Sequence, residues 1–444
     1  MSKTFQFGRR AFLAGTAGIL ASGNLCGRAG GNEPAGDRFI TGGQKRPSPS
    51  VKLPTDRLPA PEGPKKRIVA LTTAWWKYSH ADDIITKFIE GYGIVGRTHL
   101  PHCKLAGLYV EQFPESDISR GMAARYKIPM FKTPQEALTL GGTELAADGV
   151  LLIGEHGDYP LNEKGQKLYP RRRLFEEIVK VFRDSGRSVP VFNDKHLSFS
   201  WDNAKWMYDQ SRELGFPLMA GSSVPVTWRL PPLAFEPGIP LETALVAGTG
   251  SIESYGFHCL ELLQTFVEKR QGGETGVKAV QLLEGAQAQE AARQGRWPAH
   301  LLPAAMQPVP AELKRAYDAD RLQQVIVFRL EYRDGFEAAV CLAAGMVREY
   351  CFAASVRGRS EPVATATYLP KPQRDHFSFL CNHIEVMFRS GAASYPVERT
   401  LLVSGVLDAL HDSRVSGGKR IETPHLSQLK YTPAKEWPTG SPPA

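Results

Sequence analysis

Three short clusters of ionisable side chains in this sequence could do acid–base chemistry. In chain order they are residues 155–158 (Glu-His-Gly-Asp), residues 193–196 (Asn-Asp-Lys-His), and the pair His258 and Glu261. The first two directly follow short apolar runs that predict buried strands. The carboxyl ends of parallel strands share one edge of a sheet, where ligands bind. Histidine suits proton transfer because its ordinary pKa lies near neutrality. We therefore expect the first two clusters to lie together at that edge.

The second cluster lies within a strand–helix–strand unit. An apolar run at 189–192 precedes it, and a helix follows in which Trp201, Ala204, Met207 and Tyr208 recur at helical spacing. Gly215 ends this helix. A second apolar run at 216–220 then leads into Gly-Ser-Ser at 221–223.

The residues before this unit alternate in the same way and predict a doubly wound α/β sheet. Expected strands are 67–73, 105–110, 128–131 and 150–153, and expected helices are 80–92, 119–126, one starting at Thr133, and 172–185. Beyond a proline-rich stretch at 225–240 we expect strands at 323–332, 337–344, 346–356 and 362–368, and helices at 377–388 and 399–411. Asp334-Gly335 between the first two of these strands is a strong hairpin signal.

The expected fold is therefore a Rossmann-like, doubly wound parallel sheet followed by an α+β domain with an open, mainly antiparallel sheet. A chain of 444 residues is long enough for two such domains. The expected boundaries are a signal segment at 1–30, a disordered linker at 31–64, domains at 65–223 and 224–423, and an extended tail at 424–444.

The first thirty residues predict export. Arg9 and Arg10 form a twin-arginine pair, and a mild apolar region follows at 11–21. This predicts a periplasmic or extracytoplasmic protein with no membrane span in the mature chain. Cleavage near 21–23 and retention as an uncleaved anchor both stay open, as does a chance arginine pair. Cys26 follows a poor lipoprotein signal.

Charge and cysteine content narrow the function classes. The net charge of +8 comes partly from short basic runs without interleaved aromatic residues, which does not favour nucleic-acid binding. The six cysteines form no Cys-x-x-Cys pair, so a cysteine zinc site is not expected. One bridge between Cys341 and Cys351 is conceivable, although buried free thiols are the favoured reading.

Several of these features resemble the Gfo/Idh/MocA family, which are sugar and cyclitol oxidoreductases that use a nicotinamide cofactor. The tripeptide Asp194-Lys195-His196 is similar to the family's Glu-Lys-Pro, and the resemblance extends from about residue 105 to 223. His258 and Glu261 are similar to the family's His-x-x-Asp, which faces the nicotinamide site, so the resemblance implies that all three clusters converge on one site. The family's further histidine would fall at Thr265.

The resemblance implies hydride transfer between NAD(P) and a sugar or polyol. Lys195 would donate a hydrogen bond to the substrate hydroxyl, and His258 or Glu261 would accept its proton. Asp194 completes the candidate catalytic set. The resemblance also implies a homo-oligomer formed through the second domain's sheet.

The turn after the first strand departs from the family. A dinucleotide fold places Gly-x-Gly-x-x-Gly there, so that the backbone can approach the pyrophosphate. Here residues 72–80 contain no glycine and include Trp75 and Trp76. A similar spelling at 91–96 follows the next helix, where we expect a loop. The candidate cofactor-binding residues are Thr72, Thr73, Glu111 and His156.

Two other functions use the same side chains. A divalent metal could be held by a mixed carboxylate and imidazole set, for metal-assisted hydrolysis, elimination or isomerisation of a sugar. Its candidate ligands are His156, Asp158, Asp194, His196, His258 and Glu261. A non-catalytic relative could bind carbohydrate by stacking Trp75, Trp76 or Trp228 on sugar rings.

Overall fold

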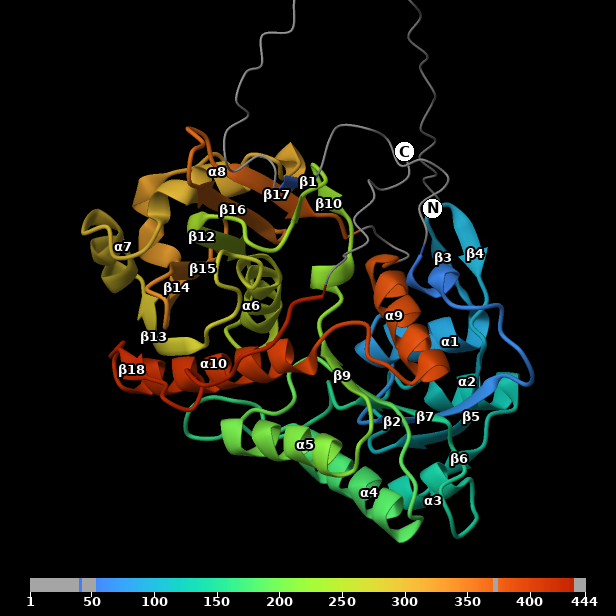
Figure 1. The fold of residues 1–444 in the computed structure, drawn as a ribbon. Coiled ribbons are helices and arrows are strands. Elements are labelled where there is room, and N and C mark those ends of the chain that lie inside the picture. Colours follow the sequence, from blue (N-terminus) through green and yellow to red (C-terminus); the bar gives the residue numbers. More distant parts are fainter. Residues whose placement is uncertain (1–39, 42–52, 370–373, 435–444) are drawn as a thin grey trace, which may run out of the picture. The chain divides into compact units, whose positions relative to one another are not determined.

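The computed structural model of the protein describes residues 40–41, 53–369 and 374–434. All of them lie within one compact unit, residues 34–444. Two large β-sheets with helices on their faces make up this unit (Figure 1). The predicted signal segment lies outside the described residues. No described helix is both long and apolar enough to span a bilayer.

The first sheet is parallel and doubly wound, as predicted. Its six strands follow the order β6-β5-β2-β7-β8-β9, and every neighbouring pair is parallel. They are β2 (Lys66–Thr72), β5 (Cys103–Val110), β6 (Met130–Phe131), β7 (Gly149–Ile153), β8 (Val191–Asp194) and β9 (Leu218–Gly221). The winding direction reverses between β2 and β7, which places the switch point of the sheet there.

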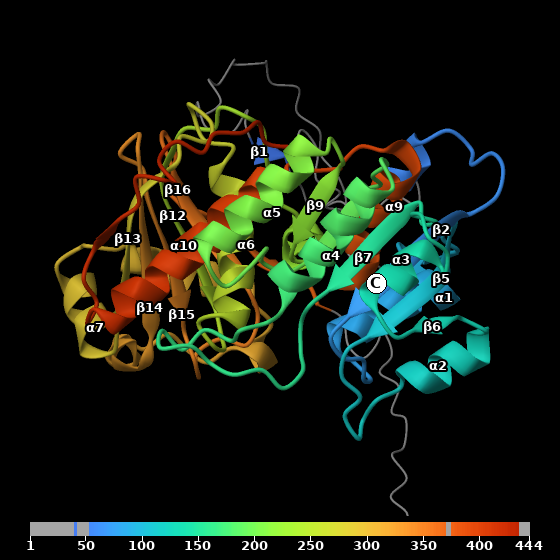
Figure 2. The same cartoon turned by 90° about the horizontal axis from the view of Figure 1, so that it is seen from below.

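Alternate residues of these strands enter two different cores. Val69 and Leu71 of β2 pack towards α3 (Pro134–Thr139), α4 (Arg171–Asp184) and α5 (Trp201–Glu213), which lie together on one face (Figure 2). Ile68 and Ala70 face the opposite core, which contains residues of α9 (His376–Ser390). The two-residue period of a strand explains this division. The chain therefore returns from its second half to complete the first sheet.

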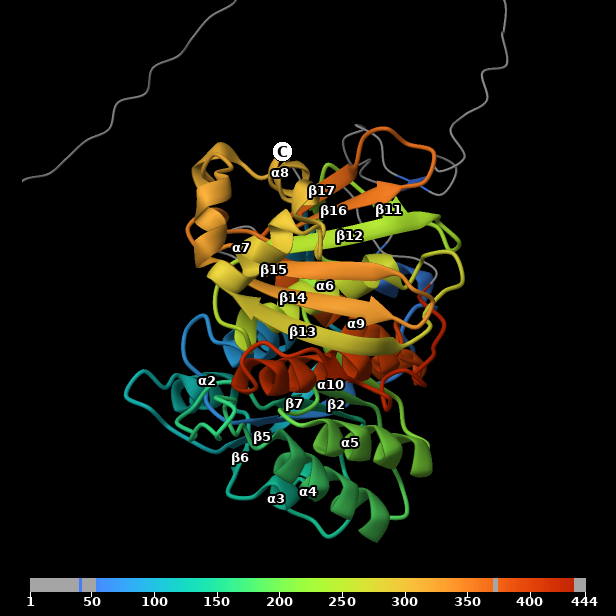
Figure 3. The ribbon, with the colours of Figure 1, turned by 90° about the vertical axis from the view of Figure 1, so that its left-hand side faces the viewer.

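The second sheet has eight strands in the order β10-β17-β16-β12-β15-β14-β13-β18. Figure 3 shows the part of this order from β17 to β13. The pair β12–β15 is parallel and the other pairs are antiparallel. The strands are β10 (Arg229–Leu230), β12 (Leu241–Gly248), β13 (Val277–Glu284), β14 (Ile326–Tyr332), β15 (Glu337–Leu342), β16 (Cys351–Val356), β17 (Val363–Thr367) and β18 (Ile421–Glu422).

Helices cover both faces of this second sheet. α6 (Ser254–Val267) and α10 (Val397–Val415) share one apolar core with it. The opposite face carries many alanines and packs against α7 (Ala286–Arg293) and α8 (Leu302–Met306). The mainly antiparallel sheet is confirmed, as is the β14–β15 hairpin at Asp334-Gly335. We expected an oligomer contact through this sheet, and oligomerisation stays a prediction.

Several local expectations differ from the structure. The helix expected at 80–92 contains a π-helical turn, Asp82–Thr86, before α1 (Lys87–Glu90). The loop expected at 91–96 belongs to a hairpin of β3 (Tyr92–Ile94) and β4 (Arg97–His99). β12 and β13 were not predicted. The apolar run 244–247 of β12 is fully buried and has the same pattern that predicted the buried strands of the first sheet, so β12 could have been predicted.

The remaining elements are short or lie outside the two sheets. They are α2 (Ser119–Tyr126) and the pair β1 (Ile40–Thr41) and β11 (Ala234–Phe235). A short 3-10 helix at Pro54–Arg57 lies in the stretch expected as a linker, and its Thr55 exchanges hydrogen bonds with Asn382 of α9. Leu426, in the stretch expected as an extended tail, is fully buried.

The five described cysteines are free and buried. Cys341 of β15 and Cys351 of β16 both pair with Ala247 of β12, from opposite sides. Two strand spacings, about 9–10 Å, therefore separate them. That distance exceeds what a disulfide can bridge.

Candidate active site

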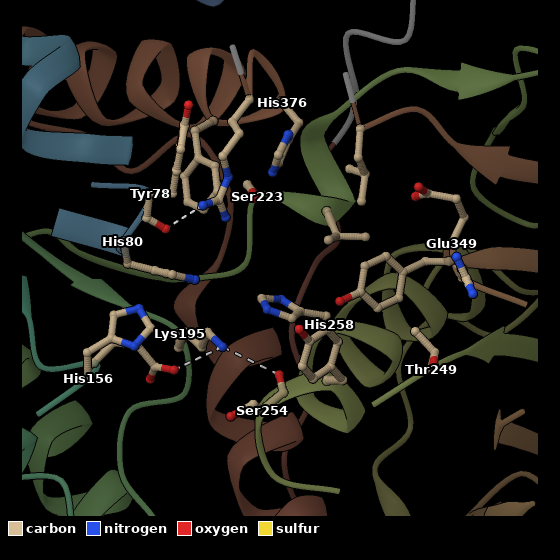
Figure 4. Close-up of a pocket in the computed structure, with 18 of the residues that line it drawn as sticks. Tyr78, His80, His156, Lys195, Ser223, Thr249, Ser254, His258, Glu349 and His376 are labelled. Carbon is tan, nitrogen blue, oxygen red and sulfur yellow. Dashed lines mark hydrogen bonds and ion pairs between the residues drawn. The ribbon is translucent and has the colours of Figure 1, made fainter. Parts of the chain in front are cut away.

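A cavity of about 870 Å³ lies at the carboxyl edge of the first sheet, and both sheets contribute to its wall (Figure 4). β2, β7 and β8 are each followed by lining residues: Tyr78 and His80, Glu155 and His156, and Lys195. The α6 region contributes Ser254, Tyr255 and His258, and the loop before β16 contributes Arg348, Glu349 and Tyr350. At least one residue of each of the three predicted polar clusters therefore lines this cavity.

Lys195 projects a tethered ammonium group into this cavity. It follows β8 with a positive φ of 63° and is 4% exposed. Its Nζ lies 3.1 Å from Glu155 Oε1 and donates to the Ser254 carbonyl oxygen at 3.5 Å. A lysine ammonium has three donor hydrogens. Two are directed to these partners, and the third is available to a ligand in the cavity.

Glu155 is the buried counter-charge of the site. Besides Lys195 it binds Arg171 of α4, whose NH2 group donates to Glu155 Oε2 at 2.5 Å. Burial by itself would raise the pKa of Glu155, but the charges of Lys195 and Arg171 outweigh it and hold that pKa well below its usual range. The carboxylate therefore stays ionised and keeps the ammonium group in place.

Two histidines face the cavity with different partners. His258 Nδ1 lies 2.6 Å from Ser222 Oγ, and burial followed by the charge of Lys195 lowers the His258 pKa well below its ordinary value. His80 Nδ1 lies 2.8 Å from Asp194 Oδ2. The two rings stack at a centroid distance of 6.3 Å. His156 lies at the edge of His80, and burial lowers its pKa to about 4.

Glu261 and Asp194 are not among the residues that line the cavity. Glu261 is fully buried and accepts a hydrogen bond from Thr400 Oγ1 at 2.8 Å, with Arg399 Nε at 3.7 Å. Burial raises its pKa. It joins α6 to α10, whereas Asp194 reaches the cavity only through His80. Their catalytic roles stay predictions.

Of the four candidate cofactor-binding residues, only His156 lines the cavity. The Thr72 hydroxyl donates to the Ile153 carbonyl at 3.1 Å, and the Thr73 hydroxyl donates to the Glu155 carbonyl at 2.7 Å. These bonds tie β2 to β7. Glu111 accepts a hydrogen bond from Tyr159 at 2.7 Å and is also paired with Arg173.

The two halves of a nicotinamide dinucleotide fit this structure unequally. The turn after β2 has no glycine, its Thr73 N–H donates to the Ile153 carbonyl, and Trp75 is wholly buried in the core beneath it. Glu111, expected to bind the ribose hydroxyls, already has two partners within the chain. The turn thus offers no cradle for the pyrophosphate. The cavity is lined by hydrogen-bonding side chains, among them Lys195, Glu155 and His258.

The metal alternative lacks a site. No group of three or more histidine, cysteine, aspartate or glutamate side chains in the described residues could hold a metal ion. Asp194 binds His80, Glu261 binds Thr400, and His196 lies against Arg171 of α4. Each of these three candidate ligands is directed to a protein partner.

The tryptophans offered for sugar stacking are mostly in the core. Trp75 is 0% and Trp228 is 2% exposed, so neither can stack on a ligand. Trp76 is partly exposed but packs against the His156 ring at a centroid distance of 4.7 Å.

Sequence reasoning missed several residues of the cavity. His80 could have been found, because it follows the carboxyl end of β2 at the start of a helix and so obeys the same edge rule as the first two clusters. Arg348 and Tyr350 come from a loop of the second sheet that carries no recognisable motif. Only the packing of the two sheets reveals them.

The sequence matches no known family profile and no curated protein. Solved structures do match. GenD2 from gentamicin A biosynthesis, in complex with NAD, has a TM-score of 0.51 at 13% identity, covering 82% of this chain and 99% of its own. An Agrobacterium radiobacter oxidoreductase in complex with NAD+, L-tartaric acid and magnesium has a TM-score of 0.48 at 12% identity, covering 81% and 98%.

A Gfo/Idh/MocA family oxidoreductase from Vibrio cholerae has a TM-score of 0.46 at 12% identity, covering 80% of this chain and 99% of its own. At 13% identity the likeness to GenD2 establishes the fold alone. The chain therefore shares with GenD2 a fold in which a doubly wound parallel sheet is followed by a mainly antiparallel second sheet.

Proposed function

We propose that the cavity is the active site of an oxidoreductase that transfers hydride between a sugar or polyol and NAD(P). The observation that carries this proposal is the buried Lys195 ammonium, held by Glu155 and the Ser254 carbonyl with one donor left for the cavity. It lies at the carboxyl edge of a doubly wound sheet, where this class of fold binds its ligands.

The chain's own residues would bind and polarise the reacting hydroxyl. Lys195 donates to the hydroxyl oxygen and stabilises negative charge that develops there, which lowers the pKa of the hydroxyl. His258 lines the cavity beside Lys195 (Figure 4) and can contact the same oxygen. A bound nicotinamide would accept or donate the hydride. No residue of the turn after β2 is assigned to its pyrophosphate.

GenD2 was crystallised with NAD, and an aldose-aldose oxidoreductase from Caulobacter crescentus has also been crystallised with glycerol. The first of these supports a nicotinamide cofactor on this fold. A nicotinamide cofactor for the present chain is a proposal. The turn after β2 lacks the glycines that such a cofactor ordinarily needs.

The test is calorimetric titration of the purified protein with NAD, NADH, NADP and NADPH, after mass spectrometry for carried-over nucleotide. Micromolar binding or a trapped nucleotide is the expected result. Nucleotide-dependent oxidation of a panel of sugars and polyols should then fall at least about 100-fold in Lys195→Met.

Lys205→Met is the matched control, since Lys205 is paired with Asp209 on the surface of α5. Absence of binding by all four nucleotides, with none trapped, would contradict hydride transfer. The cavity would then be a site for sugar binding or for chemistry without a dinucleotide.

A further inference from the structure

We propose that His80 and His258 form a complementary acceptor and donor pair for one substrate hydroxyl, and that His80 accepts its proton with Asp194 as its positioning residue. The hydroxyl-binding part stands on the geometry of the cavity, and the catalytic part rests on the proposed function. Figure 4 shows both rings reaching into the cavity beside Lys195.

The partner of His80 fixes which ring nitrogen carries its proton. Nδ1 lies 2.8 Å from Asp194 Oδ2, and an ionised carboxylate only accepts hydrogen bonds. Nδ1 of the neutral ring must therefore carry the hydrogen. Nε2 is left with a lone pair and has no hydrogen-bond partner in the described chain. His80 is 8% exposed, and that exposure is to the cavity.

The partner of His258 fixes the opposite tautomer. Ser222 Oγ accepts a hydrogen bond from the Val224 N–H at 3.0 Å and lies 2.6 Å from His258 Nδ1. The Ser222 hydroxyl hydrogen then has His258 Nδ1 as its acceptor, so Nδ1 carries a lone pair and no hydrogen. The proton of the neutral His258 ring lies on Nε2, and burial favours that neutral form.

A hydroxyl group needs one donor and one acceptor to satisfy it fully. The two rings are 6.3 Å apart between centroids, too far for a mutual hydrogen bond. Both rings line the same cavity (Figure 4), so a ligand oxygen bound beside them can contact the Nε2 of each ring. His258 would donate to that oxygen, and His80 would accept its hydrogen.

The roles of the two rings differ for the same reason. His258 has already used its lone pair on Ser222, so it can donate but cannot take a proton from the substrate. His80 has a free lone pair, and the Asp194 carboxylate can stabilise the imidazolium that forms. In this step the O–H bond breaks, its electron pair stays on oxygen, and the proton bonds to His80 Nε2. Lys195 and His258 then donate to the alkoxide.

The direct test is a long-range ¹⁵N–¹H correlation spectrum of the protein labelled at histidine, with resonances assigned through His80→Asn and His258→Asn. We expect an unprotonated Nε2 in His80 and an unprotonated Nδ1 in His258. Asp194→Asn should move the His80 proton to Nε2, since an amide can donate to Nδ1. A protonated Nε2 in the neutral His80 ring of the wild-type protein would overturn the proposal. This measurement does not depend on the folding of any variant.

Titration with D-glucose and glycerol probes the hydroxyl site without turnover. Both His80 Nε2 and His258 Nε2 should shift, and the shifts should be lost in Asp194→Asn. If neither probe perturbs either ring, the hydroxyl-binding assignment is wrong. His300→Asn is the control for general effects of a lost imidazole. His300 is exposed, lies in a short 3-10 helix before α8, and does not line the cavity.

Kinetics separate this proposal from the proposed function. His80→Asn keeps a donor near Asp194 but removes Nε2, so we expect kcat to fall about 10²- to 10⁴-fold with an unchanged nucleotide affinity. If His80→Asn keeps nucleotide-dependent turnover, the catalytic role of His80 is wrong and the proposed hydride transfer is unaffected. Correct tautomers with sugar-dependent shifts, but no nucleotide binding, would refute hydride transfer and leave the hydroxyl site standing.

Discussion

At the scale of single residues, the site depends on one buried carboxylate with two cationic neighbours. Glu155, Lys195 and Arg171 are each 4% exposed or less. Removing one member of a buried ionic group leaves the others without compensation, at a cost of about 3–5 kcal/mol. The same contact that orients Lys195 therefore also contributes to stability.

We expect Glu155→Gln to lower the free energy of unfolding at pH 7 by about 3–5 kcal/mol, measured by urea denaturation. Because Lys195 and Arg171 lower the Glu155 pKa against the effect of burial, its stabilisation is present above pH 4.5 and declines as the pH falls further. The difference between variant and wild type should narrow in acid. Glu176→Gln, which breaks a surface pair with Arg172, is the control and should change stability by less than about 1 kcal/mol.

At the scale of elements, β9, α6 and α10 meet at Gly221. This residue has a φ of +126°, and a Cβ there would lie 2.6 Å from Glu261 Oε2 and 3.0 Å from Thr400 Oγ1. Thr400 Oγ1 also lies 3.0 Å from the Ala220 carbonyl oxygen, so its single hydrogen is shared between Glu261 and Ala220. Glycine is required both by the backbone conformation and by the approach of the Glu261 carboxylate. The junction places Ser222, and through it His258.

Gly221→Ala should therefore destabilise the protein by about 2 kcal/mol or more beyond Gly215→Ala, measured as a shift in the urea midpoint. Gly215 also has a positive φ, of +65°, but a Cβ there would meet nothing within 4 Å. Equal costs for the two variants would show that the Glu261 contact is unimportant.

At the scale of the whole molecule, a buried polar network connects the second sheet's helices to the end of the described chain. Glu268, just after α6, lies 3.7 Å from Arg399 NH1 of α10 and accepts a hydrogen bond from Tyr431 at 2.8 Å. Burial raises the pKa of Glu268 to about 7, although Arg399 opposes the shift. The folded protein therefore binds a proton here that the unfolded chain releases at lower pH.

A raised pKa gives stability that is complete below pH 4.5 and is lost as the pH rises through about 7. We expect the melting temperature of the wild type to decline between pH 5 and pH 8, and Glu268→Gln to flatten that decline. Glu290→Gln, on the exposed side of α7, should leave the pH profile unchanged. A wild-type slope retained in Glu268→Gln would refute this origin.

We also propose export by the twin-arginine route, which depends on residues outside the described structure. Changing Arg9 and Arg10 to lysine should retain the protein in the cytoplasm of a bacterial host, as measured by fractionation and immunoblotting. Equal periplasmic amounts of the variant and the wild type would contradict the proposal.

The sequence by itself predicted the elements whose patterns are local. The strand–helix–strand unit around Lys195, the N-cap of α3 at Thr133, and the Asp334-Gly335 hairpin were all found, because turn residues and hydrophobic spacing act over a few neighbours. The edge rule, which needs only the order of elements along the chain, also predicted that Glu155 and Lys195 would lie near one another. The family resemblance added His258 to them.

Tertiary structure alone decided the partners of the site residues. Nothing local distinguishes Glu261, which faces α10, from His258 three residues earlier, which faces the cavity. The pairing of His80 with Asp194 joins residues 114 positions apart, and α9 completes the first sheet from the second half of the chain. These contacts depend on which faces meet when the sheets pack, and side-chain type and spacing do not encode that choice.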